Sequence, residues 1–240
     1  MGFVVLTSYS QNKSLPDSIN ITDGKGLKQG LWIKKYPNGN IKYQGYFIDD
    51  KPARFMKRFY DNGDVKSTFV FYNDNKSCAA HIFYPDSQLM AMGAYKNGKR
   101  DSLWRFYSDQ GIMVLKENYN KGLKNGISKI FYGNGNVYEE TTWINDIKEG
   151  PWKQYYEDGS IKNECNHIAD QRVGFMRTYN ENGSVYMQGL YKSNVKDSTW
   201  QYFGNSKEVL IDLNYKRGKL LNQEDLDKFI EERLKSEENE

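Results

Sequence analysis

The chain has 240 residues, of which 38% are hydrophobic and 27% are charged, and its formal net charge is +3 at pH 7. Its mean hydropathy is −0.84, and no apolar run approaches the roughly 18 residues of a membrane span, so we expect no transmembrane segment. Aromatic residues make up 15% of the sequence and include 19 Tyr, which favours strands over helices through most of the chain.

Residues 1–10 fit two interpretations. Phe3–Leu6 is apolar, and Ser8 and Ser10 precede a candidate cleavage point before Gln11, which together resemble the remnant of an export signal. No Lys or Arg precedes the apolar run, and the run is short, so an ordinary disordered start is the alternative. The first interpretation predicts a secreted or periplasmic protein, and the second a cytoplasmic one.

Residues 11–29 are predicted to form an N-terminal loop, with Ser18–Thr22 as a candidate edge strand beside the first hairpin. Residues 30–221 then form a predicted repeat domain with a period of 24 residues and about eight copies. In successive copies, the turn position is occupied by Gly39, Gly63, Ser87, Gly111, Gly135, Gly159, Gly183 and Lys207.

Aromatic and β-branched residues recur in columns around each turn position, and pairs such as Asn38-Gly39 stand between them. Because Asn and Gly accept the positive φ of primed turns, the pattern predicts β-hairpins closed by such turns. A three-residue loop is the alternative, and it would shift the strand pairing and with it the assignment of side chains to the two faces. Second loops, as at Asn97-Gly98, connect each hairpin to the next. The predicted fold class is all-β, an elongated single-layer antiparallel β-hairpin repeat of about sixteen strands of roughly five to six residues. We expect a less regular turn at Ser87.

A short C-terminal α-helix is predicted after the repeats. Asn222 is a candidate helix cap, and the pattern predicts an amphipathic helix over residues 223–236. Its apolar residues recur at spacings of three and four, at Leu226, Phe229, Ile230 and Leu234. We expect this stripe to cap the last hairpin, with docking to a partner as the alternative. Residues 222–240, the helix and an acidic tail, hold eight acids and three bases.

Few residues suit nucleophilic or metal chemistry, since the chain has two His and two Cys. Cys78 and His81 belong to the third copy, and Cys165 and His167 to the sixth. At about 4.8 Å between strands, the two pairs lie roughly 30 Å apart. That separation excludes a disulfide or a four-ligand zinc site. We therefore expect no catalytic residue, no metal, no cofactor and no enzyme.

The first candidate binding surface is a basic column at one repeat position, made of Lys57, His81, Arg105, Lys129, Lys153 and Arg177. On a regular sheet this column would present one cationic or titratable group about every 10 Å. The expected hairpin register places Glu140 opposite Lys129 and Glu164 opposite Lys153. The remaining cations, Lys57, Arg105 and Arg177, have no acid opposite within their hairpins. The column is either a binding stripe or a solvated face.

A second candidate surface is the column of Trp32, Trp104, Trp152 and Trp200. Trp104 and Trp152 are the members that we single out, either as interface anchors or as the inner packing of a thin sheet.

The phrases GLWIKKYPNGNIKYQGYF, GPWKQYYEDGSIK and YKNGKRDSLW resemble the MORN repeat, and in particular its variant in bacterial proteins of the YwqK-type toxin–antitoxin antitoxin family. The resemblance covers residues 28–220. It implies an elongated single-layer sheet of hairpins that serves in protein-protein contact and, in some members, is proposed to bind acidic lipid.

These observations together predict a non-catalytic binding or scaffold protein that mediates protein-protein interaction, with an antitoxin-like role implied by the resemblance. The alternative is peripheral binding to anionic membrane lipid through the basic column. We expect a protein partner and do not expect nucleic acid.

Overall fold

The computed structural model describes residues 18–73, 75–204 and 206–237. Both interpretations of residues 1–10 lie outside this range. The chain divides into two compact units, unit 1 (Met1–Ser87) and unit 2 (Gln88–Glu240), and each is described separately.

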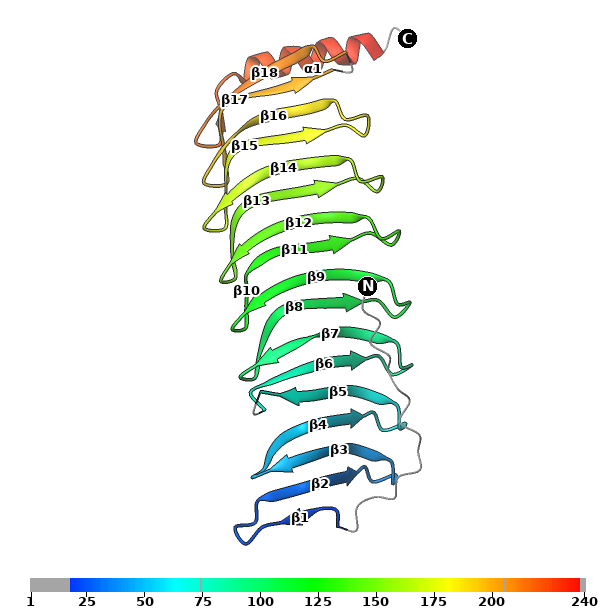
Figure 1. Cartoon of the computed structure of the whole chain (residues 1–240). Helices are drawn as coiled ribbons and strands as arrows, with labels where there is room; N and C mark the ends of the chain where they lie inside the picture. Colours follow the sequence, from blue (N-terminus) through cyan, green and yellow to red (C-terminus); the bar gives the residue numbers. More distant parts are fainter. Residues whose placement is uncertain (1–17, 74, 205, 238–240) are drawn as a thin grey trace, which may run out of the picture. The chain divides into compact units, whose positions relative to one another are not determined.

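Unit 1 is an antiparallel meander in which each described strand pairs with the next (Figure 1). Its strands are β1 (Ile21–Thr22), β2 (Lys28–Lys35), β3 (Ile41–Ile48), β4 (Lys51–Phe59), β5 (Val65–Tyr72) and β6 (Ser77–Phe83). The two-residue β1 pairs with the start of β2, within the segment where the sequence predicts an edge strand.

Unit 2 continues the same pattern and ends in the predicted helix, α1 (Gln223–Glu237). Its strands are β7 (Leu89–Lys96), β8 (Lys99–Tyr107), β9 (Met113–Asn120), β10 (Leu123–Lys124), β11 (Gly126–Phe131), β12 (Val137–Ile144), β13 (Ile147–Tyr155), β14 (Ile161–Ile168), β15 (Gln171–Tyr179), β16 (Val185–Lys192), β17 (Val195–Phe203), β18 (Val209–Lys216) and β19 (Lys219–Leu220). Most strands have eight or nine residues, longer than predicted. The all-β hairpin-repeat class is confirmed.

Of the two loop types that the sequence leaves open, the Asn-Gly hairpin between β2 and β3 has the three-residue loop rather than the primed turn. In the loop of β2 and β3, only Gly39 has positive φ (+87°), the Tyr36 N–H donates to the Asn40 carbonyl, and the Gly39 N–H donates to the Tyr36 carbonyl. This is a three-residue loop with one left-handed position, and the Asn38 side chain accepts from the Asn40 N–H. A bulge in the pairing of Lys34 and Lys35 with β3, next to this loop, restores the register that a two-residue loop would give.

Primed turns are found instead at the second loops. Asn145 and Asp146, for example, have φ of 52° and 68°, and the residues on either side of them, Ile144 and Ile147, pair directly. Two consecutive left-handed residues define the type I′ turn, whose twist matches that of the flanking strands.

The turn at Ser87 keeps the geometry of the glycine copies, contrary to expectation. Ser87 has φ of 67°, and its N–H donates to the Tyr84 carbonyl at 3.0 Å. Lys207, which also replaces the glycine, has φ of 68° and bonds in the same way to Gly204. The surrounding strands therefore impose the left-handed conformation on residues that disfavour it.

The core of unit 2 is a row of side chains on one face of the sheet, packed sideways from strand to strand. In unit 2, Trp104 and Trp200 are fully buried (0% exposed). A Cβ at Gly93 would overlap the ring of Trp104, and one at Gly189 would overlap the ring of Trp200. The missing side chains of these glycines therefore provide the space that the indole rings occupy.

Hydrogen bonds from tyrosine hydroxyls to backbone carbonyls link successive copies at the hairpin loops. The hydroxyl of Tyr132 donates to the carbonyl of Tyr155 at 2.7 Å, and that of Tyr156 donates to the carbonyl of Tyr179 at 2.6 Å. In unit 1, the hydroxyl of Tyr36 donates to the carbonyl of Phe59 at 2.9 Å. These bonds satisfy carbonyl groups at strand ends and fix the spacing of neighbouring loops.

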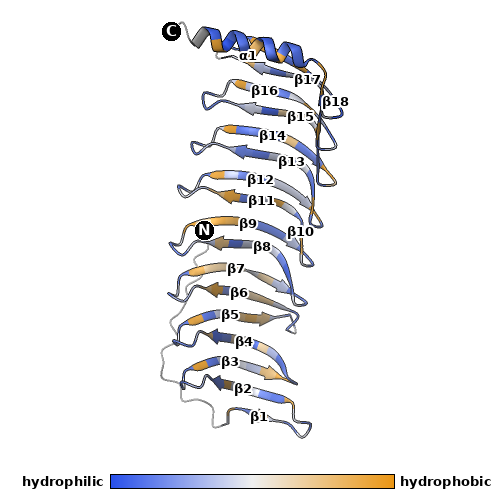
Figure 2. Ribbon diagram, turned by 180° about the vertical axis from the view of Figure 1, so that it is seen from behind, coloured by the Kyte–Doolittle hydropathy of each residue, from blue (hydrophilic) through white to orange (hydrophobic). Residues whose placement is uncertain are grey.

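Helix α1 begins beside Asn222, whose amide donates to the Asp225 carboxylate and to the Asp212 carbonyl in β18. Figure 2 shows hydrophobic residues at intervals along a mainly hydrophilic helix. Leu226 packs against the core, whereas Ile230 and Leu234 of the same stripe are 46% and 57% exposed. The helix therefore contacts the sheet along only part of its apolar stripe.

Candidate binding surface

The two sets of predicted binding residues lie on opposite faces of the sheet. Arg105 follows Trp104 directly in β8, and Lys153 follows Trp152 in β13, so each cation points away from the face that carries the tryptophan. We name the two surfaces the basic face and the aromatic face. In unit 1, Lys57 occupies the corresponding position in β4, after the buried Met56.

Acidic partners offset part of the basic column, as the sequence predicts for two members. The Lys129 ammonium lies 2.5 Å from the Glu140 carboxylate, and the Lys153 ammonium lies 3.9 Å from the Glu164 carboxylate. Arg177, for which the sequence predicts no acidic partner within its hairpin, also has one, because its guanidinium lies 3.7 Å from the same Glu164. This contact crosses from β15 to β14, the strand of the preceding hairpin, and the sequence argument considered only partners within one hairpin.

A cluster with only partial compensation lies at Arg105, Lys116 and Lys129. Arg105 pairs directly with Lys116 of β9, and Lys116 pairs with Lys129 of β11. Three cations therefore stand on neighbouring strands, and Glu140 forms an ion pair with one of them, Lys129. Like charges directly opposite one another destabilise a sheet. Sequence reasoning missed Lys116 because it belongs to a different repeat column.

An apolar column runs beside the cations on the basic face. Its members in unit 2 recur every 24 residues, at Leu103, Ile127, Pro151 and Phe175. Ile127 is 47% exposed and Phe175 is 59% exposed. A shallow groove of about 420 Å³ is lined by Pro151, Phe175, Lys153 and Arg177, among others. The basic face thus presents apolar and cationic groups side by side.

Trp104 and Trp152, the tryptophans singled out in the sequence, differ in accessibility. Trp104 is fully buried, and its indole N–H donates to the Ala94 carbonyl at 3.0 Å. Trp152 is half-buried, opposite the buried Cys165. Of the two expectations for this column, inner packing describes Trp104.

A second cationic column, which sequence reasoning missed, covers the rings of the aromatic face. In unit 2 it consists of Arg100, Lys124, Lys148, Arg172 and Lys196, again 24 residues apart. The Arg100 guanidinium lies 4.8 Å from the ring centre of Trp104, and the Lys196 ammonium lies 4.3 Å from that of Trp200. Such cation–π contacts stabilise the rings and shield them from water. The signal in the sequence is the basic residue that follows the second loop in most copies.

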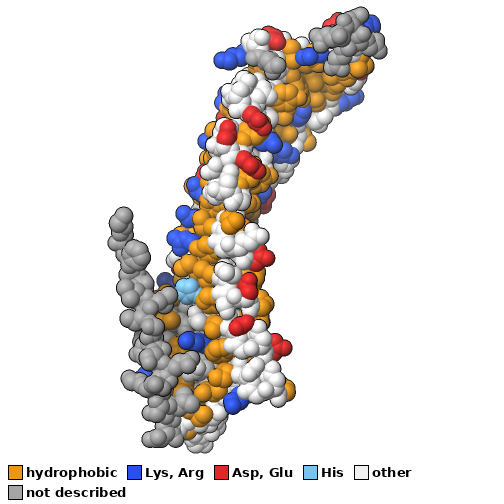
Figure 3. Space-filling view, turned by 90° about the vertical axis from the view of Figure 1, so that its right-hand side faces the viewer, with side chains coloured by type: hydrophobic (Ala, Val, Ile, Leu, Met, Phe, Trp, Pro, Cys, Tyr) orange, Lys and Arg blue, Asp and Glu red, His pale blue; other side chains and the backbone are white. Residues whose placement is uncertain are grey.

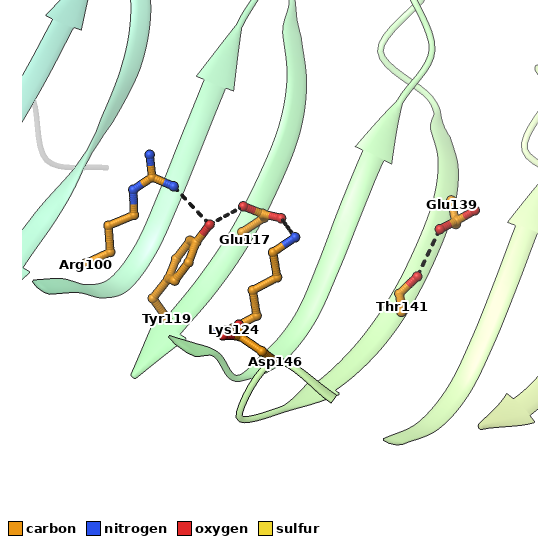
Figure 4. A network of polar contacts seen from close by, with 7 residues as sticks. All are labelled: Arg100, Glu117, Tyr119, Lys124, Glu139, Thr141 and Asp146. Atoms are coloured by element: carbon orange, nitrogen blue, oxygen red, sulfur yellow. Dashed lines mark hydrogen bonds and ion pairs between the residues drawn. The ribbon is translucent and has the colours of Figure 1, made fainter. Parts of the chain in front are cut away.

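Two members of this column, Arg100 and Lys124, take part in a polar network around a buried carboxylate (Figure 4). Glu117 is 4% exposed and accepts from the Lys124 ammonium at 2.6 Å and from the Tyr119 hydroxyl at 2.5 Å. The Arg100 guanidinium donates to the same hydroxyl at 3.1 Å. Burial and the bond to Glu117 raise the pKa of Tyr119 to about 12. The network keeps a charge satisfied within the core row.

Cys165 and His167 are both buried on the aromatic face. Burial raises the pKa of the Cys165 thiol to about 11, so the thiol is protonated at neutral pH. Burial also lowers the pKa of His167, and the nearby Lys148 and Arg172 lower it further. Both groups are neutral and packed against their neighbours, as expected for core residues. Within the described residues, no three His, Cys, Asp or Glu side chains gather in a way that could hold a metal ion.

The geometry defines a repeat sheet with two chemically distinct faces. Three copies, residues 28–49, 124–145 and 148–169, match the family model described as MORN repeat variant. MORN repeats on an open sheet fit a binding or scaffold role. No described helix is long and apolar enough to cross a membrane.

A search of curated proteins found no match. Among solved structures, the chain is similar to one in the crystal structure of TcdB2-TccC3-Cdc42, with 10% identity and a TM-score of 0.17. The similarity covers 83% of this chain and 16% of that chain, and at this TM-score it has no bearing on function.

Proposed function

We propose that this chain is a non-catalytic scaffold that binds an acidic segment of another protein on the basic face of unit 2. The observation that carries the proposal is the row of Arg105, Lys116 and Lys129, which face one another across β8, β9 and β11. A carboxylate-bearing partner placed over this row would offset the repulsion between Arg105 and Lys116, which Glu140 leaves uncompensated because it pairs with Lys129.

The apolar column beside the row supplies the rest of the surface. Ile127 lies two residues before Lys129 in β11, and its side chain is 47% exposed. A partner segment with alternating apolar and acidic side chains would place apolar groups on Ile127 and Phe175, and acids on the cations. Apolar contacts then contribute affinity, and the charges fix the register and speed association.

An antitoxin-like role is the more specific form of this proposal. The resemblance to the YwqK-type family supports it, with the toxin as the protein that carries the acidic segment. In this form the sheet covers a surface of the toxin, and no reaction of the chain itself is involved.

The test compares two double substitutions on the same face. A partner recovered with the whole chain is titrated against Arg105→Gln/Lys116→Gln and against the control Lys153→Gln/Arg177→Gln, at about 0.05 M and about 0.2 M salt. We expect the first pair to weaken binding about tenfold and to flatten its salt dependence. The control should have a smaller effect, because Glu164 already offsets its cations. Equal effects of the two pairs would contradict the proposed site.

Anionic lipid is the alternative ligand for the same cations. Flotation with vesicles of phosphatidylcholine alone, and of phosphatidylcholine with phosphatidylserine, distinguishes the two proposals. Salt-sensitive flotation with the anionic vesicles alone, lost in Arg105→Gln/Lys116→Gln, would favour lipid and count against a protein partner at this site.

A further inference from the structure

The strands of unit 1 carry positive charge without negative charge. Strands β1–β6 contain nine Lys and Arg residues and no Asp or Glu, and every described acidic residue of this unit lies in a loop. Residues 18–87 hold eleven Lys and Arg and seven Asp, a net charge of +4. In unit 2, by contrast, acids such as Glu140 and Glu164 lie in the strands. The sheet of unit 1 therefore favours an anionic ligand.

Three of these cations line one groove in unit 1. The groove has a volume of about 300 Å³ and is lined by Lys42 of β3, Arg58 of β4 and Lys66 of β5, together with Tyr36, Tyr43, Met56 and Phe59. None of these lining residues is acidic. Figure 3 faces the hairpin loops, such as the one between β2 and β3, and shows hydrophobic side chains beside their polar residues. The groove thus joins an apolar lining to cations from three consecutive strands, and its volume is at the lower end of the range for small-molecule sites.

The fold does not require cations at these positions. Lys42 and Lys66 share one repeat position, which in later copies holds Met90, Val114, Tyr138, Lys162, Tyr186 and Leu210. Arg58 occupies another position, which in later copies holds Ile82, Phe106, Ile130, Gln154, Thr178 and Tyr202. The same hairpins form in those copies with mostly uncharged side chains. The concentration of charge in one groove of unit 1 therefore indicates a role in binding.

The three cations are available to a ligand, since all three residues are exposed. Within the described part of the chain, the Arg58 guanidinium has no hydrogen-bond, ion-pair or ring partner. The Lys42 ammonium lies 5.4 Å from the ring centre of Tyr36, and the Lys66 ammonium lies 5.2 Å from that of Tyr60. Neither ammonium donates a hydrogen bond to a described side chain. Both therefore keep their N–H donors for a ligand.

We propose that this groove binds a phosphate monoester that carries a planar aromatic ring. The phosphate, with a charge of about −1.5 to −2 at pH 7, lies among Lys42, Arg58 and Lys66, and the planar guanidinium bonds two of its oxygens at once. The ring packs on Met56 and Phe59, which form part of the apolar lining. This site lies in unit 1 and does not depend on the function proposed for the basic face of unit 2.

The test is calorimetric titration of the whole chain with two pairs of probes, phosphotyrosine with tyrosine, and adenosine 5′-monophosphate with adenosine. We expect saturable binding of one molecule per chain for the phosphorylated member of at least one pair, which identifies the ring that the groove accepts. Its unphosphorylated counterpart should bind about tenfold more weakly, because the cations act on the phosphate. Glycerol 3-phosphate, which has the phosphate without the ring, should also bind about tenfold more weakly.

Two double substitutions locate the site. Arg58→Gln/Lys66→Gln removes two lining cations and should weaken binding of the phosphorylated probe about tenfold. Lys51→Gln/Lys57→Gln is the matched control, since it removes the same charge from exposed positions of β4 that do not line the groove. The control should weaken binding less than about twofold, because charges beyond the groove are screened by salt.

Circular dichroism and thermal unfolding show whether both double variants are folded. The proposal is overturned if neither phosphorylated probe binds the wild-type chain saturably, or if glycerol 3-phosphate binds as tightly as they do. Equal loss of affinity in the two folded double variants would also overturn it.

Discussion

Two glycines in one hairpin loop, Gly133 and Gly135, allow the free-energy cost of a left-handed backbone conformation to be measured separately from steric effects. Gly135 has φ of +87°, Gly133 has no positive φ, and a Cβ added at either position meets nothing within 4 Å. Gly135→Ala should therefore lower the free energy of unfolding by about 1 kcal/mol through backbone strain alone. Gly133→Ala, the control, should be neutral or slightly stabilising. Urea unfolding measures both, and equal stability of the two variants would contradict the loop geometry.

His167 gives a prediction for the pH dependence of stability. Burial, Lys148 and Arg172 lower its pKa in the folded chain, and Asp170 and Glu139 only partly oppose them. Between the lowered pKa and the unfolded value of about 6.5, the unfolded chain binds more protons than the folded one. The contribution of neutral His167 to the free energy of unfolding is therefore fully present above the unfolded value, about pH 6.5, and is lost as the pH falls through the lowered pKa of the folded chain.

The measurement compares the wild-type chain with His167→Phe in urea unfolding between about pH 7.5 and 5. The stability of the wild type relative to His167→Phe should fall on acidification, because His167→Phe removes the titrating group. Carboxylates elsewhere titrate in both proteins and cancel in the difference. A difference that is independent of pH would show that His167 keeps its ordinary pKa in the folded chain.

Among the elements, α1 is held to the sheet by few side chains. Leu226 packs against a cluster that contains Trp200 and Leu213, whereas Leu234 is 57% exposed. Leu226→Ser should lower the free energy of unfolding by about 2 kcal/mol and promote self-association through the uncovered strands. Leu234→Ser, the control on the same helix, should change it by less than about 0.5 kcal/mol.

Thermal unfolding and light scattering after size-exclusion chromatography measure these two effects. If both variants match the wild type, α1 does not stabilise the last strands, and the partner-docking alternative for the helix gains support.

At the scale of the whole molecule, charge is distributed unevenly along the chain. Residues 222–240 carry −5, and because the whole chain carries +3, residues 1–221 carry +8. Within unit 2, the basic face has unbalanced cations around Arg105 and Lys116, and ion-paired ones around Glu164. A steering field for acidic partners therefore arises from one part of the face rather than from the full column.

Much of the fold could be predicted because its signals are local. The 24-residue period, the alternation along each strand and the turn residues lie within short stretches of sequence, and they predicted the hairpins, α1 and the pairing of Lys129 with Glu140. The loop type at the Asn-Gly pairs could not be predicted, because Asn-Gly suits both a primed turn and a three-residue loop with one left-handed glycine. The bulge beside the three-residue loop kept the predicted strand register correct.

The sequence by itself thus determined the repeat, the class of fold and which residues share a column. Only the tertiary structure decided which columns meet across strands of different copies, as Arg177 meets Glu164 and Arg105 meets Lys116. It also decided that Trp104 is buried, because the space for its ring comes from Gly93 on the neighbouring strand. The physical reason is that a strand inside a sheet has two neighbours, and contacts with the strand of another copy depend on the combined geometry of both kinds of loop.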